Sequence, residues 1–215
     1  MSQTVKTKKV NPIIISPNSC RKYQIKSDES YNFYLVDVLN SNTNTNLTID
    51  ITKGGNCTLN IYALSDGFHK IIKLRINHNS YTTSNTIVKA FASNHSTIKL
   101  DLINIASPKT TKIVQNQSVD GILFDKNSSI DVTPSMLIDT NAIKASHAVN
   151  IGNINPNHLF YLMSRGLTKT KATMTILNGM FATLNEQEIT QDLYNKATLF
   201  LKKIIKETNE NKDKS

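Results

Sequence analysis

The stretch Ser146-His147-Ala148-Val149-Asn150-Ile151-Gly152 marks the point where this chain changes its structural character. Before it, short segments with the composition of β-strands follow one another, and after it the pattern becomes that of amphipathic helices. The sequence therefore predicts a strand-rich part over residues 1–152, a helical part over residues 153–208, and a charged, disordered tail over residues 209–215.

Upstream of the junction, apolar and β-branched runs recur at intervals of about ten residues. In residues 47–52 every second residue is apolar, which is the period of a half-buried strand. The links between the runs are short and rich in Ser, Asn, Asp and Gly, which tolerate tight turns. The predicted strands are residues 12–16, 31–39, 47–52, 58–63, 70–76, 86–91, 97–105, 121–124 and 143–148.

Many short strands in succession are typical of a sandwich, a barrel or a solenoid. Corners rich in Asn and Ser suit a parallel β-helix, in which stacked turns repeat the same corner. The sequence has no clean period, so composition by itself leaves all three architectures open.

Downstream of the junction, the first helix signal is Asn155 as a capping residue before Pro156. This helix is predicted to run through Met163 and to end at Gly166, a typical residue just beyond a helix. A second helix is predicted from a cap at Thr168 to about residue 179.

A third helix is predicted to begin at Asn185, with Glu188 three residues later as in a capping box. Lysines near its end complement the helix dipole. Its apolar residues recur at helical spacing and form one stripe: Ile189, Leu193, Ala197, Phe200, Leu201, Ile204 and Ile205.

The formal net charge of +9 raises the question of nucleic-acid binding. The basic residues are scattered, however, and arginine, the better reader of phosphates and guanines, occurs only at Arg21, Arg75 and Arg165. The joint abundance of Lys, Asn and Ile is what AT-biased codon usage produces. Charge therefore does not favour a nucleic-acid partner.

The sequence contains none of the common catalytic or phosphate-binding motifs, so nothing in it indicates an enzyme. There is no Cys-X-X-Cys pair for zinc, and the two cysteines are far apart. Cys57 lies in a predicted strand as a small buried side chain, and Cys20 lies in a turn-like segment. Neither a signal peptide nor a membrane-length apolar run is present, which favours a cytoplasmic protein.

The region from Lys112 to Phe181 resembles the SufB/SufD family of iron–sulfur cluster assembly proteins, and within it the SufD-like branch. In the family a strand segment with a proline precedes a Ser-His-Gly-Ala-Thr-X-Gly-like motif and a helix reading Leu-Phe-Tyr-Leu-X-Ser-Arg-Gly-Leu. The matching residues here, in the same order and spacing, are Pro134, then Ser146, His147 and Gly152, then Phe160, Arg165 and Gly166, and finally Phe181.

The resemblance implies a parallel β-helix followed by a small helical domain, with Phe160 and Phe181 among the core residues that seat the helices. The helical domain that precedes the β-helix in the family has no counterpart in this sequence, so the chain resembles a short form. Upstream the likeness is thinner: residues 78–88 resemble a stretch beginning His-Leu-Ala-Pro, with Tyr81 in the place of the proline.

The resemblance also implies a non-catalytic scaffold role. In the family a SufB-like and a SufD-like subunit pair through their β-helices, and their C-terminal helices dock a SufC-like ABC ATPase. By this likeness His147 is a candidate iron or cluster-assisting ligand at the partner interface, since neutral imidazole binds iron. The partner is a SufB-like subunit or, in a homodimer, a second copy.

Two departures from the family limit what this chain can hold. Ser128 occupies the position where our alignment places an essential cysteine of SufB-like chains, and Ala148 replaces the glutamate that follows their histidine. Thiolates are the usual cluster ligands. We therefore expect no stably bound cofactor, and at most a transient iron or iron–sulfur cluster shared with the partner.

Two other function classes remain as alternatives. A carbohydrate-active β-helix enzyme requires carboxylates clustered on one face of the solenoid. A basic nucleic-acid-binding module requires salt-dependent binding to DNA or RNA.

Overall fold

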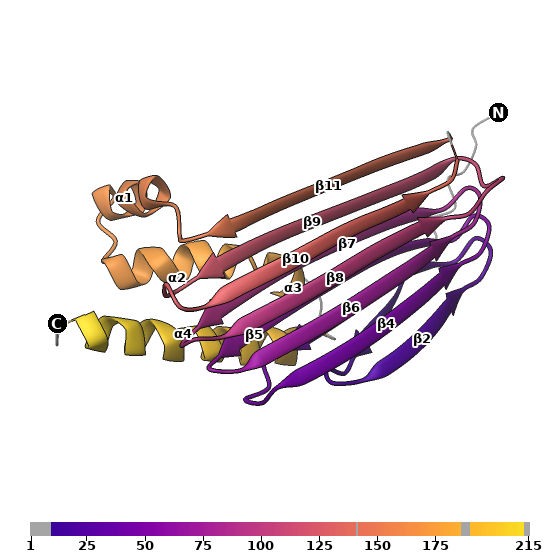
Figure 1. Ribbon diagram of the computed structural model, residues 1–215. Coiled ribbons are helices and arrows are strands. Elements are labelled where there is room, and N and C mark those ends of the chain that lie inside the picture. Colours follow the sequence, from indigo (N-terminus) through magenta and orange to yellow (C-terminus); the bar gives the residue numbers. More distant parts are fainter. Residues whose placement is uncertain (1–9, 141, 186–189, 213–215) are drawn as a thin grey trace.

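The computed structural model describes residues 10–140, 142–185 and 190–212 of the chain (Figure 1). Within them the odd-numbered strands form a six-stranded sheet in the order β1-β3-β5-β7-β9-β11, and the even-numbered strands form a five-stranded sheet in the order β10-β8-β6-β4-β2. The strands are β1 Val10–Ile15, β2 Cys20–Ile25, β3 Ser30–Asp37, β4 Thr43–Ile51, β5 Asn56–Asp66, β6 His69–His78, β7 Thr83–Ser93, β8 Thr97–Ala106, β9 Ile113–Leu123, β10 Ser129–Ile138 and β11 Ile143–Gly152.

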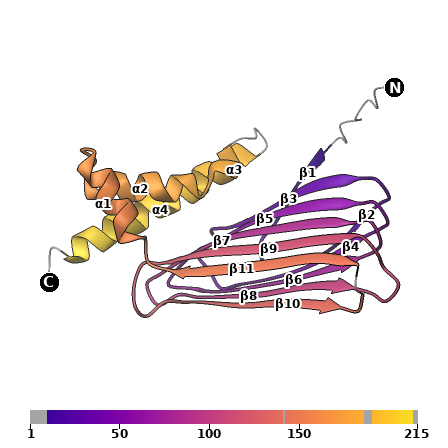
Figure 2. The same cartoon turned by 90° about the horizontal axis from the view of Figure 1, so that it is seen from above.

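Consecutive strands alternate between the two sheets, and neighbours within each sheet are parallel. The chain therefore winds as a flattened solenoid in which one strand of each sheet makes up a turn, and Figure 2 shows the two layers facing each other. This arrangement confirms the predicted parallel β-helix. It excludes an antiparallel sandwich or barrel for the described strands, because consecutive strands do not pair with each other.

The strand register explains why the sequence lacks a clean period. Ser30 pairs with Asn56, Asn56 with Thr83, and Thr83 with Val114, so successive turns advance by 26, 27 and 31 residues. The stacked segments stay aligned because the extra residues are absorbed in the corners between strands.

One corner repeats a left-handed backbone conformation from turn to turn. Asp28, Gly54, Tyr81 and Lys112 have φ angles of 62°, 80°, 62° and 54°. The stack is joined by backbone hydrogen bonds such as the one from the Tyr81 N–H to the Thr111 oxygen, 2.8 Å. A proline ring cannot adopt a positive φ, so a proline in the place of Tyr81 would require a different corner.

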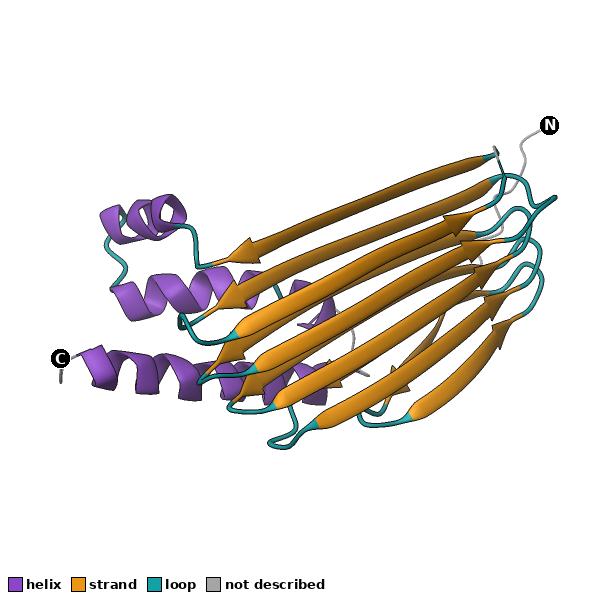
Figure 3. Cartoon of the chain, in the orientation of Figure 1, coloured by secondary structure: helices purple, strands orange, loops and turns teal. Residues whose placement is uncertain are grey.

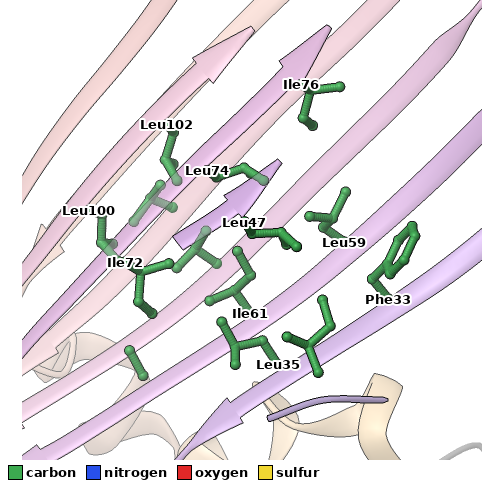
Figure 4. Close-up of a cluster of buried hydrophobic side chains, with 14 of the residues drawn as sticks. Phe33, Leu35, Leu47, Leu59, Ile61, Ile72, Leu74, Ile76, Leu100 and Leu102 are labelled. Atoms are coloured by element: carbon green, nitrogen blue, oxygen red, sulfur yellow. The ribbon is translucent and has the colours of Figure 1, made fainter. Parts of the chain in front are cut away.

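The interior between the sheets is the main hydrophobic core. Strand β4 alternates buried and exposed residues along its whole length, as its sequence pattern predicted. Residues such as Ile72, Leu74 and Leu100, labelled in Figure 4, are at most 1% exposed, and each such side chain contributes roughly 1.5–3 kcal/mol through burial.

A buried ion pair joins the two sheets at one corner. Lys70 on β6 and Asp37 at the end of β3 both have fully buried side chains, and their charged atoms lie 2.6 Å apart. Lys70 also donates to the Leu39 oxygen at 3.0 Å. Burial lowers the pKa of Lys70, and the Asp37 charge opposes that effect.

The helices cover the outer face of the six-stranded sheet near the carboxyl ends of its strands (Figures 1 and 2). They are α1 Pro156–Ser164, α2 Lys169–Gly179, α3 Ala182–Asn185 and α4 Gln191–Lys212. A second core joins Tyr34, Tyr62 and Phe91 of the strands to Leu177, Ala197 and Leu201 of the helices and to Phe181, which lies between α2 and α3. The Phe181 ring stacks on Tyr62 and Phe91 with centroids 5.3 and 5.1 Å away.

The predicted helices agree with the structure in α1 and α2, including the caps at Asn155 and Thr168 (Figure 3). The third helix differs, because Asn185 ends the short helix α3 and α4 starts at Gln191. The predicted capping box at Glu188 lies outside the described residues. Helix α4 continues to Lys212, and the disorder expected for residues 209–215 stays a prediction.

The sequence pattern also missed strands β2 and β10 and the first part of β9. Strand β2 reads Cys-Arg-Lys-Tyr-Gln-Ile and lies at an edge with mostly exposed side chains. Strand β10 contains Pro134, and β9 buries glutamines where an apolar residue is the usual choice. Each departs from the apolar alternation by which strands are recognised.

Candidate functional site

The last turn of the β-helix ends in an uncovered edge. Among the strands that the structure describes, β11 pairs only with β9, and β10 pairs only with β8. Every second residue of β9 is buried along most of its length, whereas most residues of β11 are exposed. An edge strand carries backbone N–H and C=O groups that no further strand satisfies, so this open end can accept another strand.

The register places His147 on the interior face of this open end. His147 pairs with Gln117 of β9, whose side chain is 2% exposed and points between the sheets. Neighbours paired in a sheet share a face, so His147 faces the interior too, and it is exposed because no turn follows it.

Ser146 faces the opposite, outer side of the sheet. Its hydroxyl donates to Oδ1 of Asn116 at 2.7 Å, and the amide of Asn116 donates to Oδ1 of Asn85 at 3.1 Å. These three residues form a polar ladder on the outer surface. The adjacent residues Ser146 and His147 therefore lie on opposite faces of the six-stranded sheet.

Pro134 lies on the facing strand of the open end. The Gln117 amide nitrogen donates to the Leu102 oxygen of β8 at 3.3 Å, across the interior. Pro134 pairs with Leu102 and His147 with Gln117, so Pro134 and His147 occupy facing strands in the next turn. A proline, which lacks an N–H, fits best on an edge strand such as β10.

Ser128, which we predicted to take the place of the cysteine of SufB-like chains, lies away from His147. It precedes β10 at the corner, is 6% exposed, and donates its hydroxyl proton to Asp125 Oδ2 at 2.8 Å. The hydroxyl oxygen of Ser128 in turn accepts a hydrogen bond from the Ser96 N–H at 3.1 Å. Ser128 thus stabilises the corner, whereas His147 lies in the middle of β11, so the structure does not bring the two residues together.

Among the residues that the structure describes, no three His, Cys, Asp or Glu side chains gather into a metal-binding group. A single imidazole supplies one ligand of the several that iron requires. His147 can therefore contribute to a metal site only if the remaining ligands come from outside the described part of the chain.

His78 is a buried histidine whose environment the sequence did not reveal. Its ring nitrogens lie 2.9 Å from the Thr82 hydroxyl and 3.1 Å from the Ser84 hydroxyl. Burial lowers the pKa of His78 to about 4, and the Asn104 side chain opposes this effect. With both nitrogens engaged, His78 is a neutral residue of the core.

The two cysteines offer no thiolate at the open end. Cys57 is buried, as predicted, and burial raises the pKa of its thiol to about 12. Cys20 is exposed, but it begins strand β2, at the edge of the five-stranded sheet opposite to β10. The turn predicted around Cys20 is therefore a strand.

The residues of the helical motif have separate roles. Phe181 is fully buried, whereas Phe160 is 74% exposed, so the prediction that Phe160 is a core residue was wrong. The reason is that α1 has no buried residue and contacts mainly α2. Arg165 stacks on the Tyr161 ring at 5.4 Å from its centroid.

The two glycines of the motif also differ from each other. Gly166 has φ of +92° just beyond α1, as expected of a residue that ends a helix. A side chain at Gly152 would meet no atom within 4 Å. The structure therefore gives a backbone reason for glycine at residue 166 and none at residue 152.

Helix α4 presents a groove that combines apolar and basic side chains. Leu199 is 69% exposed, and Lys203 reaches across to Asp66 at 3.1 Å. The groove is lined by Val38, Asn40, Lys196, Leu199, Phe200, Lys202, Lys203 and Lys206. It is suited to a partner surface that is apolar and acidic.

The carboxylates on the outer face of the five-stranded sheet do not cluster. Asp50 lies 2.9 Å from the Lys22 ammonium, which together with the Asn77 amide holds the pKa of this carboxyl below its usual value. Asp101 is in register with Lys73, and Asp131 with Lys99. Acids alternate with lysines across these strands, which is unlike the paired carboxylates of a glycosidase.

The described residues thus define a two-sheet parallel β-helix with a helical layer and an open last turn that carries one histidine. The family model of the SufBD core domain of the SUF system for FeS cluster assembly matches residues 17–180. The chain belongs to this family.

The individual relatives include proteins named SufD and a protein named SufB. The chain is 28% identical over 154 residues to the iron–sulfur cluster assembly protein SufD of Escherichia coli, covering 69% of this chain and 35% of that protein. It is 28% identical over 123 residues to SufB of Bacillus subtilis, covering 57% and 26%. It is 35% identical over 61 residues to SufD of Bacillus subtilis, covering 28% and 14%.

The aligned regions span about a third or less of the length of these relatives. In the part of the chain that the structure describes, no helix is both long and apolar enough to cross a membrane.

Proposed function

We propose that this chain is a non-catalytic, SufD-like scaffold subunit of a SUF-type iron–sulfur cluster assembly complex. The observation that carries the proposal is the open last turn, in which His147 faces the interior of an unpaired sheet edge. A SufB-like subunit, or a second copy of the chain, adds its own strands to this edge. The pairing satisfies the free backbone groups of β11 and encloses His147 between two subunits.

The chemistry of the open end supports an assisting role for His147. Thiolates hold most iron–sulfur clusters, and Cys57 is buried while Cys20 lies at the opposite sheet edge. The partner therefore supplies most ligands of a transient iron or cluster, and His147 adds a neutral imidazole.

The groove on α4 is the surface that we assign to a SufC-like ABC ATPase. Its exposed Leu199 and its lysines lie on the helical layer, away from the open edge of β11. Two partners can thus bind at the same time, one at the edge and one at the helices.

Co-purification with a SufB-like chain and a SufC-like ATPase tests the scaffold role. A double variant, Ala145→Lys with Val149→Lys, introduces charge on the interior face of β11 and is expected to lose the SufB-like chain while keeping the ATPase. Leu199→Asp should do the reverse. Ile14→Lys, at a position 43% exposed on β1, which is the other edge of the six-stranded sheet, is the matched control.

Retention of neither partner by the unmodified chain would overturn the scaffold role. His147→Ala tests the metal role separately: it should lower cluster formation in a complex that remains intact. A cluster yield equal to that of the unmodified complex would reduce His147 to a structural residue.

A further inference from the structure

Gln117 lies directly below His147 in the stack of turns. The two residues are paired in the register of β9 and β11 and face the same interior. Cα atoms of paired neighbours in a sheet lie about 4.8 Å apart, so a glutamine amide and an imidazole at these positions are within reach of each other.

The orientation of the Gln117 amide is set from the opposite sheet. Its nitrogen donates to the Leu102 carbonyl oxygen at 3.3 Å, and a carbonyl can only accept, so the NH₂ end must point there. The other end, Oε1, is buried and has no hydrogen-bond partner within the described residues. Buried amide oxygens are normally satisfied, so this one requires a donor.

The buried amide nitrogens of Asn104 and Gln115 also have no partner among the described residues. Two other side chains that carry a donor lie directly next to Gln117 in the stack of turns. Thr86 lies one turn below, in register with Gln117, and its buried hydroxyl likewise has no partner among the described residues. His147 lies one turn above, exposed on an edge strand where its ring can rotate. Only His147 connects the interior to the open end.

We infer that Gln117 is a positioning residue for His147. Its Oε1 accepts a hydrogen bond from one ring N–H of His147, which fixes the tautomer and directs the lone pair of the other nitrogen toward the open end. Partners of this kind orient metal-binding histidines in many proteins. The inference rests on the proposed role of His147 and adds the residue that prepares its ring for a metal.

Histidine ring spectra of the ¹⁵N-labelled full chain test this assignment at mildly alkaline pH, where imidazoles are neutral. We expect a single tautomer of His147 in the unmodified chain and an averaged pair of tautomers in Gln117→Leu. Gln117→Glu should restore the single tautomer, because a carboxyl oxygen at this position accepts from the ring N–H as the amide oxygen does. Thr86→Val is the control and should leave the His147 signals unchanged.

Cobalt(II) titration of the same proteins in complex with a SufB-like subunit, which supplies the further metal ligands, gives a second readout. Loss of the Gln117 oxygen should weaken the binding of this probe by about 10–100-fold, and circular dichroism verifies that each variant is folded. A single tautomer that persists in Gln117→Leu, or averaged tautomers in the unmodified chain, would overturn the inference. The tautomer measurement uses the chain alone, so it can succeed even if no partner co-purifies, and it can fail while both partners are retained.

Discussion

Strands β9 and β11 are neighbours with the same register but opposite environments. Val119 and Val149 are paired residues of one type, yet Val119 is 2% exposed and Val149 is 43% exposed. The difference comes from the next turn of the solenoid, which covers β9 and is absent above β11. In a solenoid, burial is therefore a property of the stack more than of the strand's own sequence.

The helical layer shows the same contrast. Phe181 fits between Tyr62 and Phe91 of the sheet, whereas Phe160 extends from α1 into solvent. Helix α1 thus resembles strand β11, because both leave apolar side chains uncovered. Uncovered apolar residues that lie together mark a surface for a partner, and the contrast can be tested by paired substitutions.

The largest difference should come from the two phenylalanines. Phe181→Ala removes a fully buried ring and is expected to lower the free energy of unfolding by about 3–5 kcal/mol. Phe160→Ala should change it by less than about 0.5 kcal/mol in the isolated chain. Urea denaturation of both variants measures the difference, and equal losses would show that α1 is packed in solution.

The next largest difference should separate a central turn from the last one. Leu74→Ala creates a cavity in the core between the sheets and is expected to cost about 2–5 kcal/mol. Val149→Ala on β11 should cost less than about 1 kcal/mol, because the side chain is already part-exposed. A large loss for Val149→Ala in the isolated chain would mean that the open end is already covered, for instance by a second copy.

A pH titration extends the comparison to the polar part of the core. Burial lowers the pKa of His78 from 6.5 to about 4, so the unfolded chain binds more protons than the folded chain between these values. The free energy of unfolding therefore has its full value, as far as His78 is concerned, above pH 6.5. It falls by about 3 kcal/mol in total as the pH is lowered to about 4, because the unfolded chain takes up the proton first.

Thermal unfolding of His78→Gln checks this value. The variant should show a weaker dependence of stability on pH within that window, whereas Leu74→Ala should retain the dependence at a lower stability. An unchanged pH dependence in His78→Gln would assign the effect to other groups.

The smallest expected effect lies on the outer face of the last turn. Ser146→Ala removes the hydrogen bond to Asn116 but leaves both positions accessible to water. The cost should be below about 1 kcal/mol, measured by urea denaturation. A larger loss would show that the outer polar ladder contributes to the stability of β11.

The sequence predicted the change from strands to helices, the helix boundaries around Pro156 and Gly166, and the buried stripe of α4 because each of these is a local signal. It did not predict the polar interior. Gln115 and Gln117 are buried in β9, and no local rule indicates a strand whose inward positions are glutamines.

Only part of the candidate site could be predicted from the sequence. The motif around His147 came from the family likeness, but the face of the strand on which the histidine lies follows from its pairing with Gln117 thirty residues earlier. The exposure of Phe160 could not be predicted from the sequence either. A helix motif shows which positions are apolar, but it does not show whether another part of the protein covers them.

The variable corners have a consequence for how this chain tolerates change in length. Each turn closes through its own corner, and turns of 26 to 31 residues stack in one register. An extra residue in a corner therefore lengthens a loop at little entropic cost, whereas one extra residue inside a strand reverses the faces of the residues that follow it in that strand. Insertions and deletions should accumulate at the corners, so relatives can diverge in spacing while the order of side chains along the interior is preserved.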